Sequence, residues 1–442
     1  MRSIRQAEGA LHELFGKISK KAAEASGVIE RKRKFDAVSL AKTFVLGFMG
    51  KPNASDEDLA QTAAQVGAAV TAQAIDQRHT RRLVDFLKVL FGQAVQCVVA
   101  SKHSLAPILD RFSSVTLLDS TLVRLPDECR QEFPGCGGPA GASRAALKLQ
   151  VEFDLRTGAL RHVEAQAGRQ ADGSTGRQQA RRGKGSLRIA DLAYFSTYVF
   201  AAMTAAGEYF LSRLQFNVGV LSPGGEKLEL LAWLGRQRGR FIDEPILLNH
   251  RTQFACRLIA WRLPPEQAAR QRARTRRDMQ RRYGREPTAE RLAWCDWTIL
   301  VTNVPAKILS VPEAAVLYRA RWQVELLFKR WKSQGCIAQL QGSTAIRQLV
   351  RVWSRLIGVV VQHWLIVAVA WGDPTRSLSK MSEAVRSFVG RILVTLNRRQ
   401  ELRRTMQDLE RALSKTCRRN KRKKPGTFEL LNDPAQCDFH LT

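Results

Sequence analysis

Hydrophobic and polar positions follow a helical period near both ends of the chain and a strand period between them. Residues 39–50 and 80–100 are apolar runs with helical spacing, and the same pattern resumes over residues 335–415. Ser55 followed by Asp58 is typical of a helix start, although aspartate replaces the more usual glutamate or glutamine. The pattern therefore predicts helical regions at both ends.

The pattern changes at residue 113, where short runs with the strand period begin. One buried run ends at Asp119 and another at Asp191, and two alternating runs joined by Arg-Thr-Gly predict an antiparallel hairpin. Ser196 is a candidate cap for a helix that follows Asp191. The predicted strands lie at residues 113–119, 147–155, 159–166, 187–191 and 209–215. This order predicts an α/β fold with a mixed five-stranded sheet and helices on its faces.

Residues 216–305 carry further strand-like runs, interrupted by an arginine-rich helix at residues 267–286. We expect this segment to be a β-rich insertion. The predicted division is an N-terminal helical region, the first part of the sheet core, the insertion, the second part of the core, and a C-terminal helical region with a basic tail, at residues 1–105, 106–215, 216–305, 306–375 and 376–442.

Residues 317–332 predict a single amphipathic helix with a polar stripe beside its apolar face. An α-helix advances about 100° per residue, so the polar residues of the stripe fall within an arc about 60° wide. They are Tyr318, Arg321, Glu325 and Lys332. The neighbouring arc holds Leu317, Ala320, Val324, Leu327, Phe328 and Trp331. Taken alone, the stripe is equally consistent with an ordinary i,i+4 ion pair between Arg321 and Glu325.

The chain is strongly basic, with 71 Lys and Arg residues, 40 Asp and Glu residues, and a formal net charge of +31. A field of this sign favours a polyanion as partner, because each neutralised phosphate releases condensed counterions. A membrane is the alternative, but the chain shows no signal peptide, and Gln362 and His363 interrupt the longest apolar stretch at residues 356–371. We expect a buried helix there. Because of the net charge, we also expect DNA contacts at the basic segments 31–34 and 73–82, and solvated helix faces are the alternative for both.

The eight cysteines form no C-x-x-C pair and no zinc-binding spacing with histidine. Their scatter is typical of reduced thiols in a cytoplasmic protein. Because the seven histidines are also dispersed, we expect any metal to be held by carboxylates.

Asp119 and Asp191 stand at the ends of buried strands, where ligands gather in open α/β sheets. They become partners only if the sheet brings their strands side by side. Four other acids on or near the strands alternate with apolar residues, so we expect them on the solvent face. They are Asp110, Glu152, Asp154 and Glu164.

These residues together resemble a known family. The spacing Y-x2-R-x3-E-x6-K, met by Tyr318, Arg321, Glu325 and Lys332, is similar to the signature of the DDE transposases of bacterial cut-and-paste insertion sequences, the Y-R-E-K group. The segments LLDST and IADLAY resemble the strands that carry the first and second aspartates of that family. The second aspartate is followed by Leu-Ala-Tyr, where many relatives have glycine before the aromatic residue.

The resemblance implies an RNase H-like core in which Asp119, Asp191 and Glu325 hold two Mg²⁺ ions, with Mn²⁺ able to substitute. Three converging carboxylates would repel one another, and hard divalent cations relieve that repulsion. Two such ions suit an in-line displacement at a phosphate.

The same resemblance implies DNA contacts near the carboxylates. Tyr318, Arg321 and Lys332 would hold the DNA backbone beside an extruded base, and Trp297 would stack on that base. Trp294 is an alternative stacking residue, and core packing is an alternative role for Trp297.

The implied activity is nicking of DNA at insertion-sequence ends and joining of the 3′-hydroxyl ends to target DNA. The implied partners are double-stranded DNA at terminal inverted repeats, target DNA, and a second copy of the chain in a homodimeric end complex. Two alternatives stay open: an inactive relative that only binds ends, and a nuclease of the same fold that cuts without joining.

Overall fold

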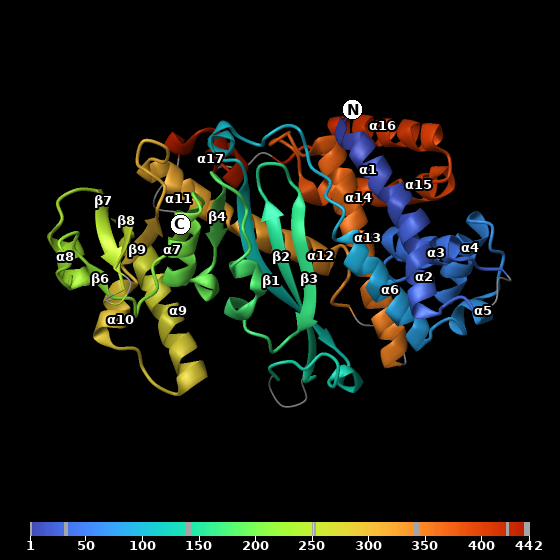
Figure 1. The fold of residues 1–442 in the computed structure, drawn as a ribbon, viewed down its shortest axis with the longest axis horizontal. Helices are drawn as coiled ribbons and strands as arrows, with labels where there is room; N and C mark the ends of the chain where they lie inside the picture. The colour runs from blue at the N-terminus through green and yellow to red at the C-terminus, as the bar shows by residue number, and fades with distance from the viewer. Residues whose placement is uncertain are drawn as a thin grey trace. The chain divides into compact units, whose positions relative to one another are not determined.

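The computed structural model describes residues 2–30, 34–137, 143–249, 251, 253–339, 344–420 and 424–436. The chain forms two compact units, each built from segments that are distant in the sequence (Figure 1). Unit 1 comprises Met1–Leu105, Asp119–Gln170 and Gln323–Lys421, and unit 2 comprises Ala106–Leu118, Ala171–Trp322 and Arg422–Thr442. Residues 31–33 of the predicted basic segment and residues 421–423 of the basic tail lie outside the described residues. The five-part division drawn from the sequence stays a prediction.

Unit 1 is mainly helical, as expected for both ends of the chain. Its helices are α1 (Arg2–Glu13), α2 (Ser19–Ser26), α3 (Ala37–Gly50), α4 (Asp56–Gln65), α5 (Ala72–Asp76), α6 (Arg81–Ala94), α12 (Trp322–Ser333), α13 (Ala345–Ala370), α14 (Leu378–Ser387), α15 (Val389–Thr395) and α16 (Arg399–Thr416), with a π-helical turn at Leu14–Ile18.

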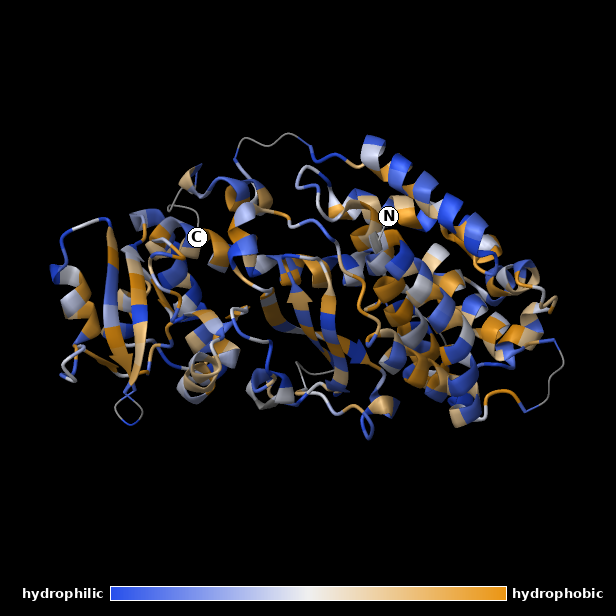
Figure 2. Ribbon diagram, turned by 45° about the horizontal axis from the view of Figure 1, so that its top comes forward, coloured by the Kyte–Doolittle hydropathy of each residue, from blue (hydrophilic) through white to orange (hydrophobic). Residues whose placement is uncertain are grey.

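Helix α13 forms the centre of this helical part. Helices α1, α3, α6, α14 and α16 pack against it, and Figure 2 shows hydrophobic residues gathered between them. Helix α13 is long and apolar enough to cross a membrane, but 89% of its most apolar window is buried. The prediction of a buried helix over residues 356–371 is confirmed.

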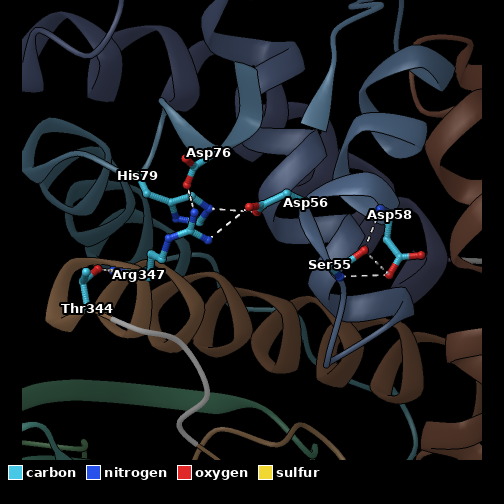
Figure 3. Close-up of polar contacts among 7 residues, drawn as sticks. All are labelled: Ser55, Asp56, Asp58, Asp76, His79, Thr344 and Arg347. Carbon is cyan, nitrogen blue, oxygen red and sulfur yellow. Dashed lines mark hydrogen bonds and ion pairs between the residues drawn. The ribbon is translucent and has the colours of Figure 1, made fainter. Parts of the chain in front are cut away.

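Ion pairs tie the N-terminal helices of unit 1 to the start of α13 (Figure 3). Arg347 Nη1 lies 3.0 Å from Asp56 Oδ2, and the same guanidinium pairs with Asp76. His79 Nε2 lies 3.2 Å from the other oxygen of Asp56. Asp56 therefore receives two partners at the start of α4.

Two predicted helix starts are confirmed. Ser55 Oγ accepts a hydrogen bond from the N–H of Asp58 (3.2 Å), and the Asp58 carboxylate accepts one from the N–H of Ser55 (2.9 Å). At the start of α7 (Thr197–Ala205), Ser196 Oγ accepts a hydrogen bond from the N–H of Val199.

Within the described residues, the strands form one nine-stranded sheet in the order β3-β2-β1-β4-β5-β9-β8-β7-β6. The strands are β1 (Val115–Leu125), β2 (Ala145–Asp154), β3 (Leu160–Ala167), β4 (Leu187–Ala190), β5 (Tyr209–Arg213), β6 (Val220–Leu221), β7 (Phe241–Leu248), β8 (Phe254–Arg262) and β9 (Trp297–Thr302). Strands β2 and β3 form the predicted antiparallel hairpin, and β1, β4 and β5 are parallel. This order of the first five strands is the mixed, RNase H-like arrangement that we expected.

The predicted β-rich insertion belongs to unit 2 and extends the same sheet. Strand β9 pairs antiparallel with β5, with Leu211 opposite Thr302, and β8, β7 and β6 follow. The other helices of unit 2 are α8 (Leu230–Arg236), α9 (Pro265–Tyr283), α10 (Ala289–Trp294), α11 (Val311–Ala320) and α17 (Thr427–Asn432). The arginine-rich segment is thus helical, as predicted.

The expectation that the first strand ends at Asp119 is wrong. Strand β1 continues to Leu125. Its paired segment with β4 ends where Leu118 lies opposite Ala190, and β1 has β2 as its other neighbour in the sheet. Asp119 therefore lies within a longer strand.

The prediction that Glu152 and Asp154 lie on a solvent face is also wrong. Their exposed fractions are 1% and 0%. Every residue of β2 is buried, so alternation along this strand does not separate a wet face from a dry one. Asp154 is satisfied locally: it accepts hydrogen bonds from the Thr157 hydroxyl (2.9 Å) and from the Arg161 guanidinium (2.7 Å).

Candidate active site

The parallel pairing of β1 and β4 brings the two predicted aspartates to neighbouring positions. Leu118 lies opposite Ala190, and the next residue on each segment is Asp119 and Asp191, respectively. Leu118 and Ala190 are buried together with Tyr194 in a small cluster. The sheet therefore supplies a buried base for two carboxylates that are distant in the sequence.

Local structure leaves both aspartates partly exposed. Asp191 follows the last residue of β4, and a short 3-10 turn at Leu192–Tyr194 then leads the chain away. Asp119 Oδ1 accepts a hydrogen bond from the N–H of Ser120 (2.8 Å). Asp191 therefore lies at a strand end, where a ligand can reach a carboxylate, whereas Asp119 lies within β1, just beyond the segment that pairs with β4.

The single helix expected over residues 317–332 is instead two helices, α11 and α12, that meet at Arg321. The N–H of Arg321 donates to the carbonyl of Tyr318, three residues back (3.1 Å). Such a bond tightens the helix by one residue. Arg321 itself keeps right-handed helical dihedral angles, with φ −49° and ψ −36°.

The predicted apolar face of this segment is confirmed. Its six residues are at most 5% exposed: Leu317, Ala320, Val324, Leu327, Phe328 and Trp331. The polar residues of the stripe are all partly buried, which is consistent with a stripe at the margin of the packed face.

Tyr318 and Arg321 line a cavity of about 330 Å³ in unit 2. Arginine and tryptophan residues make up half of its wall. They include Arg213, Arg319, Arg321, Trp261 and Trp322. Guanidinium groups bind phosphate through paired donors, and aromatic rings stack on bases, so this wall suits a nucleotide.

Burial and nearby charges shift the pKa of Tyr318. Burial raises the pKa of Tyr318 to about 12, and the nearby Asp191 also raises it, whereas Arg213 and Arg321 lower it. The hydroxyl therefore keeps its proton at neutral pH and can donate a hydrogen bond. The charge of Asp191 thus acts on Tyr318, a residue of the cavity wall.

Glu325 and Lys332 lie on α12, in unit 1. Glu325 belongs to the first turn of this helix, and Lys332 to the last. Burial lowers the pKa of Lys332. Both side chains are partly exposed, so each can reach a ligand.

The donor set favours a hard cation. Asp119, Asp191 and Glu325 offer carboxylate oxygens, which are the ligands that magnesium takes in proteins. In the part of the chain that the structure describes, no three His, Cys, Asp or Glu side chains are already gathered as a metal site. The seven described cysteines are free thiols, as predicted.

The structure does not bring Trp297 to the cavity. Thr298 lines it, and successive side chains of a strand point to opposite faces, so Trp297 faces the other way. Trp297 packs against the core cluster of unit 2 and lies under the Arg262 guanidinium, 5.6 Å from the ring centre. Trp294 packs against the same cluster.

Residues 110–360 match the family model described as Transposase DDE domain. The chain belongs to this family. It is 27% identical over 365 residues to the transposase for insertion sequence element IS231B of Bacillus thuringiensis subsp. berliner, covering 77% of this chain and 75% of the relative. It is 25% identical over 318 residues to the transposase for insertion sequence element IS1151 of Clostridium perfringens, covering 66% of each.

Sequence reasoning missed Trp322 as a candidate DNA contact of this DDE transposase domain. Trp322 lines the cavity and is 53% exposed. The available signal was its angular position: about 40° from Tyr318, it falls outside the apolar arc and cannot serve the core. An exposed tryptophan directly after Arg321 indicates a ligand contact rather than core packing.

Proposed function

We propose that this protein is a transposase that cleaves DNA at insertion-sequence ends and joins the freed 3′-hydroxyl ends to target DNA. The observation that carries the proposal is the register of β1 and β4, with Leu118 opposite Ala190 and a carboxylate next on each segment. Membership of the transposase family supports the reaction class. The names of its relatives support insertion-sequence ends as the substrate.

Asp119, Asp191 and Glu325 are the proposed ligands of two Mg²⁺ ions, which Mn²⁺ could replace. When bound, such ions would activate the attacking oxygen and stabilise the leaving one. The three carboxylates would orient this chemistry at one phosphate. The two aspartates lie on or next to strands of the sheet, whereas Glu325 lies on a helix. We propose that binding of metal and DNA brings the Glu325 carboxylate to the two aspartates.

Tyr318, Arg321 and Lys332 are proposed to bind the DNA backbone beside the scissile phosphate. Arg321 can hold a phosphate with two parallel hydrogen bonds. Tyr318 keeps its proton, because its pKa is about 12, and would donate to an anionic oxygen. The half-buried Lys332 would add positive charge from α12.

The cavity beside Tyr318 is proposed to receive an extruded base. Trp322 is the better stacking candidate, because it is exposed and lines the cavity, whereas Trp297 faces the other side of β9. Stacking on an aromatic ring is worth roughly 1–3 kcal/mol per base, which offsets part of the unstacking cost. Terminal inverted repeats, target DNA and a homodimer on two ends complete the proposed partners.

Replacing Glu325 or Asp191 by alanine tests this function. We expect each variant to lose cleavage of DNA that carries the flanking inverted repeats, in Mg²⁺ or Mn²⁺, while end binding is kept. Glu164→Gln is the matched control, because Glu164 is a partly exposed acid on β3. We expect this variant to cleave normally. Products are resolved on denaturing gels.

The outcomes separate the alternatives. Absence of cleavage by the wild-type protein with either ion would leave only an end-binding relative. Cleavage without joined products would indicate a nuclease of the same fold. Loss of binding together with cleavage in Glu325→Ala would mean that Glu325 is part of the framework.

A further inference from the structure

Helix α9 in the insertion carries four arginines on one line. Arg270, Arg274, Arg277 and Arg281 follow a spacing of four, three and four residues. At about 100° per residue they fall within an arc about 60° wide. All four are exposed, and the side chains of Arg270, Arg274 and Arg281 are 81%, 81% and 72% accessible. We call these four residues the α9 stripe.

The opposite side of α9 is fixed to unit 2. Ala268 is 3% exposed. Thr275 Oγ1 lies 3.3 Å from Cys295 Sγ, and Arg272 pairs with Asp296. The helix therefore cannot turn its stripe toward the core, and its C-terminal half extends past the neighbouring strands in Figure 1.

Acids on the same helix neutralise the stripe only in part. The helix has seven arginines and two acids, Glu266 and Asp278. Arg270 lies 3.9 Å from Glu266, Arg274 3.8 Å from Asp278, and Arg281 3.2 Å from Asp278. Exposed pairs of this kind are weak and screened by salt, so an anionic ligand can displace them.

We propose that the α9 stripe docks the phosphate backbone of duplex DNA without reading its sequence. The four Cα atoms span about 16 Å of helix, and a duplex offers one phosphate charge per about 1.7 Å of its axis. Each guanidinium can therefore meet a phosphate.

This surface is separate from the cavity beside Tyr318 and Arg321. Only Gln271, on the flank of α9, reaches that cavity. The inference rests on the proposed function for the identity of the polyanion. It adds a second contact with the duplex. The stripe would bind the DNA backbone at a distance from the cleaved phosphate.

A comparison of two double variants tests the proposal. Arg274→Gln with Arg277→Gln removes two charges from the stripe. Arg276→Gln with Arg282→Gln removes two charges from the same helix, at about 240° and 120° from Arg270. Glutamine keeps the helix propensity of arginine, and circular dichroism checks that both variants of the full chain are folded.

The measurement is the dissociation constant for a duplex of unrelated sequence, without divalent metal, over a range of salt concentrations. One lost phosphate contact should weaken binding about fivefold at about 0.15 M salt and reduce the slope of log K against log salt by about 0.9. The stripe variant should therefore lose about 30-fold and about 1.8 in slope. The off-stripe variant should stay within about threefold of the wild type.

Equal losses in the two variants would show that only net charge matters, and would overturn the proposal. Unchanged binding in the stripe variant would also overturn it. The assay needs no cleavage, so a protein that never cuts DNA can still pass it. A protein that cuts ends normally can still fail it.

Discussion

Replacing Arg355 by methionine should destabilise unit 1 and loosen the end of the helix that carries Glu325. Arg355 lies on α13 and is 1% exposed. Its Nε donates to the carbonyl of Pro52 (2.9 Å), and its Nη1 donates to the carbonyls of Cys336 (2.7 Å) and Gln339 (2.6 Å). One side chain therefore joins the loop after α3 to the turn after α12.

That turn needs the support. Cys336 has a φ of 51°, in the left-handed region that costs an ordinary residue about 1–2 kcal/mol. Gly335, just before it, approaches α13 so closely that an added Cβ would lie 2.3 Å from Val359 Cγ1. The bond from Arg355 fixes the carbonyl of Cys336 in this strained turn.

The expected loss follows from the hydrogen bonds. Each bond from a charged donor contributes roughly 1.5–3 kcal/mol, and methionine would leave three carbonyls without it. Removing the buried charge offsets part of this loss in the free energy of unfolding, because the folded protein no longer carries the cost of desolvating it. That cost is seen in the pKa of Arg355, which burial lowers to about 10. We expect a net loss of about 4 kcal/mol, or a fall in Tm of about 8–16 °C for a unit of this size.

Calorimetry of the full chain gives Tm, and hydrogen exchange of peptides covering residues 331–339 reports on the turn. Arg351→Met is the matched control, because Arg351 lies one turn earlier over the same Phe48 ring, 5.9 Å from its centre. Replacing Arg351 leaves the hydrogen bonds from Arg355 to the loop carbonyls intact. We expect it to cost less than about 1 kcal/mol.

A fall in Tm of less than about 2 °C in Arg355→Met, with unchanged exchange over residues 331–339, would refute the reasoning. Equal falls in the two variants would attribute the effect to lost charge near Phe48, rather than to the loop carbonyls.

Two further predictions concern a buried histidine and the cavity. Burial, and then the nearby Arg330, lower the pKa of His363 from 6.5 to about 4, although its bond to the Gly158 carbonyl (2.7 Å) opposes this. As pH falls, His363 therefore takes up a proton at a higher pH in the unfolded chain than in the folded one. The free energy of unfolding should fall by about 3 kcal/mol as pH drops from 6.5 to 4. In urea titrations, the His363→Gln variant should lack this pH-dependent fall in the free energy of unfolding. An unchanged pH dependence in the variant would contradict the prediction. Trp322→Ala should weaken complexes with cleaved ends about tenfold in gel-shift assays and Trp297→Ala less than threefold, and the reverse order would restore Trp297 as the stacking residue.

The parts of the fold that local periodicity controls could be predicted from the sequence. The apolar face that includes Val324 and Trp331 has a helical period, and its residues are buried because they all project to one side. The hairpin of β2 and β3 was visible as two alternating runs around a glycine turn. Asp119 and Asp191 could be paired as candidates, because both follow apolar runs.

Features set by distant neighbours could not be predicted in this way. The continuation of β1 to Leu125 depends on the sheet neighbours of its second half. The burial of Asp154 depends on Arg161 across the hairpin and on cover over both faces of β2. The direction of Trp297 follows from Thr298, the next residue of β9, which lines the cavity. The side chains of a strand alternate between its two faces, but the sequence does not say which face meets the cavity.

The charges near Asp191 explain why binding and chemistry should separate in the carboxylate variants. Asp191 acts electrostatically on Tyr318, and so do Arg213 and Arg321, so negative and positive groups both lie near this tyrosine. Metal ions would occupy the carboxylates, and a phosphate would meet the arginines. Removing Asp191 makes the local potential more positive, which favours DNA while it deletes a metal ligand. End binding at least as tight as that of the wild type, with cleavage lost, is therefore the result that assigns Asp191 to the reaction rather than to the framework.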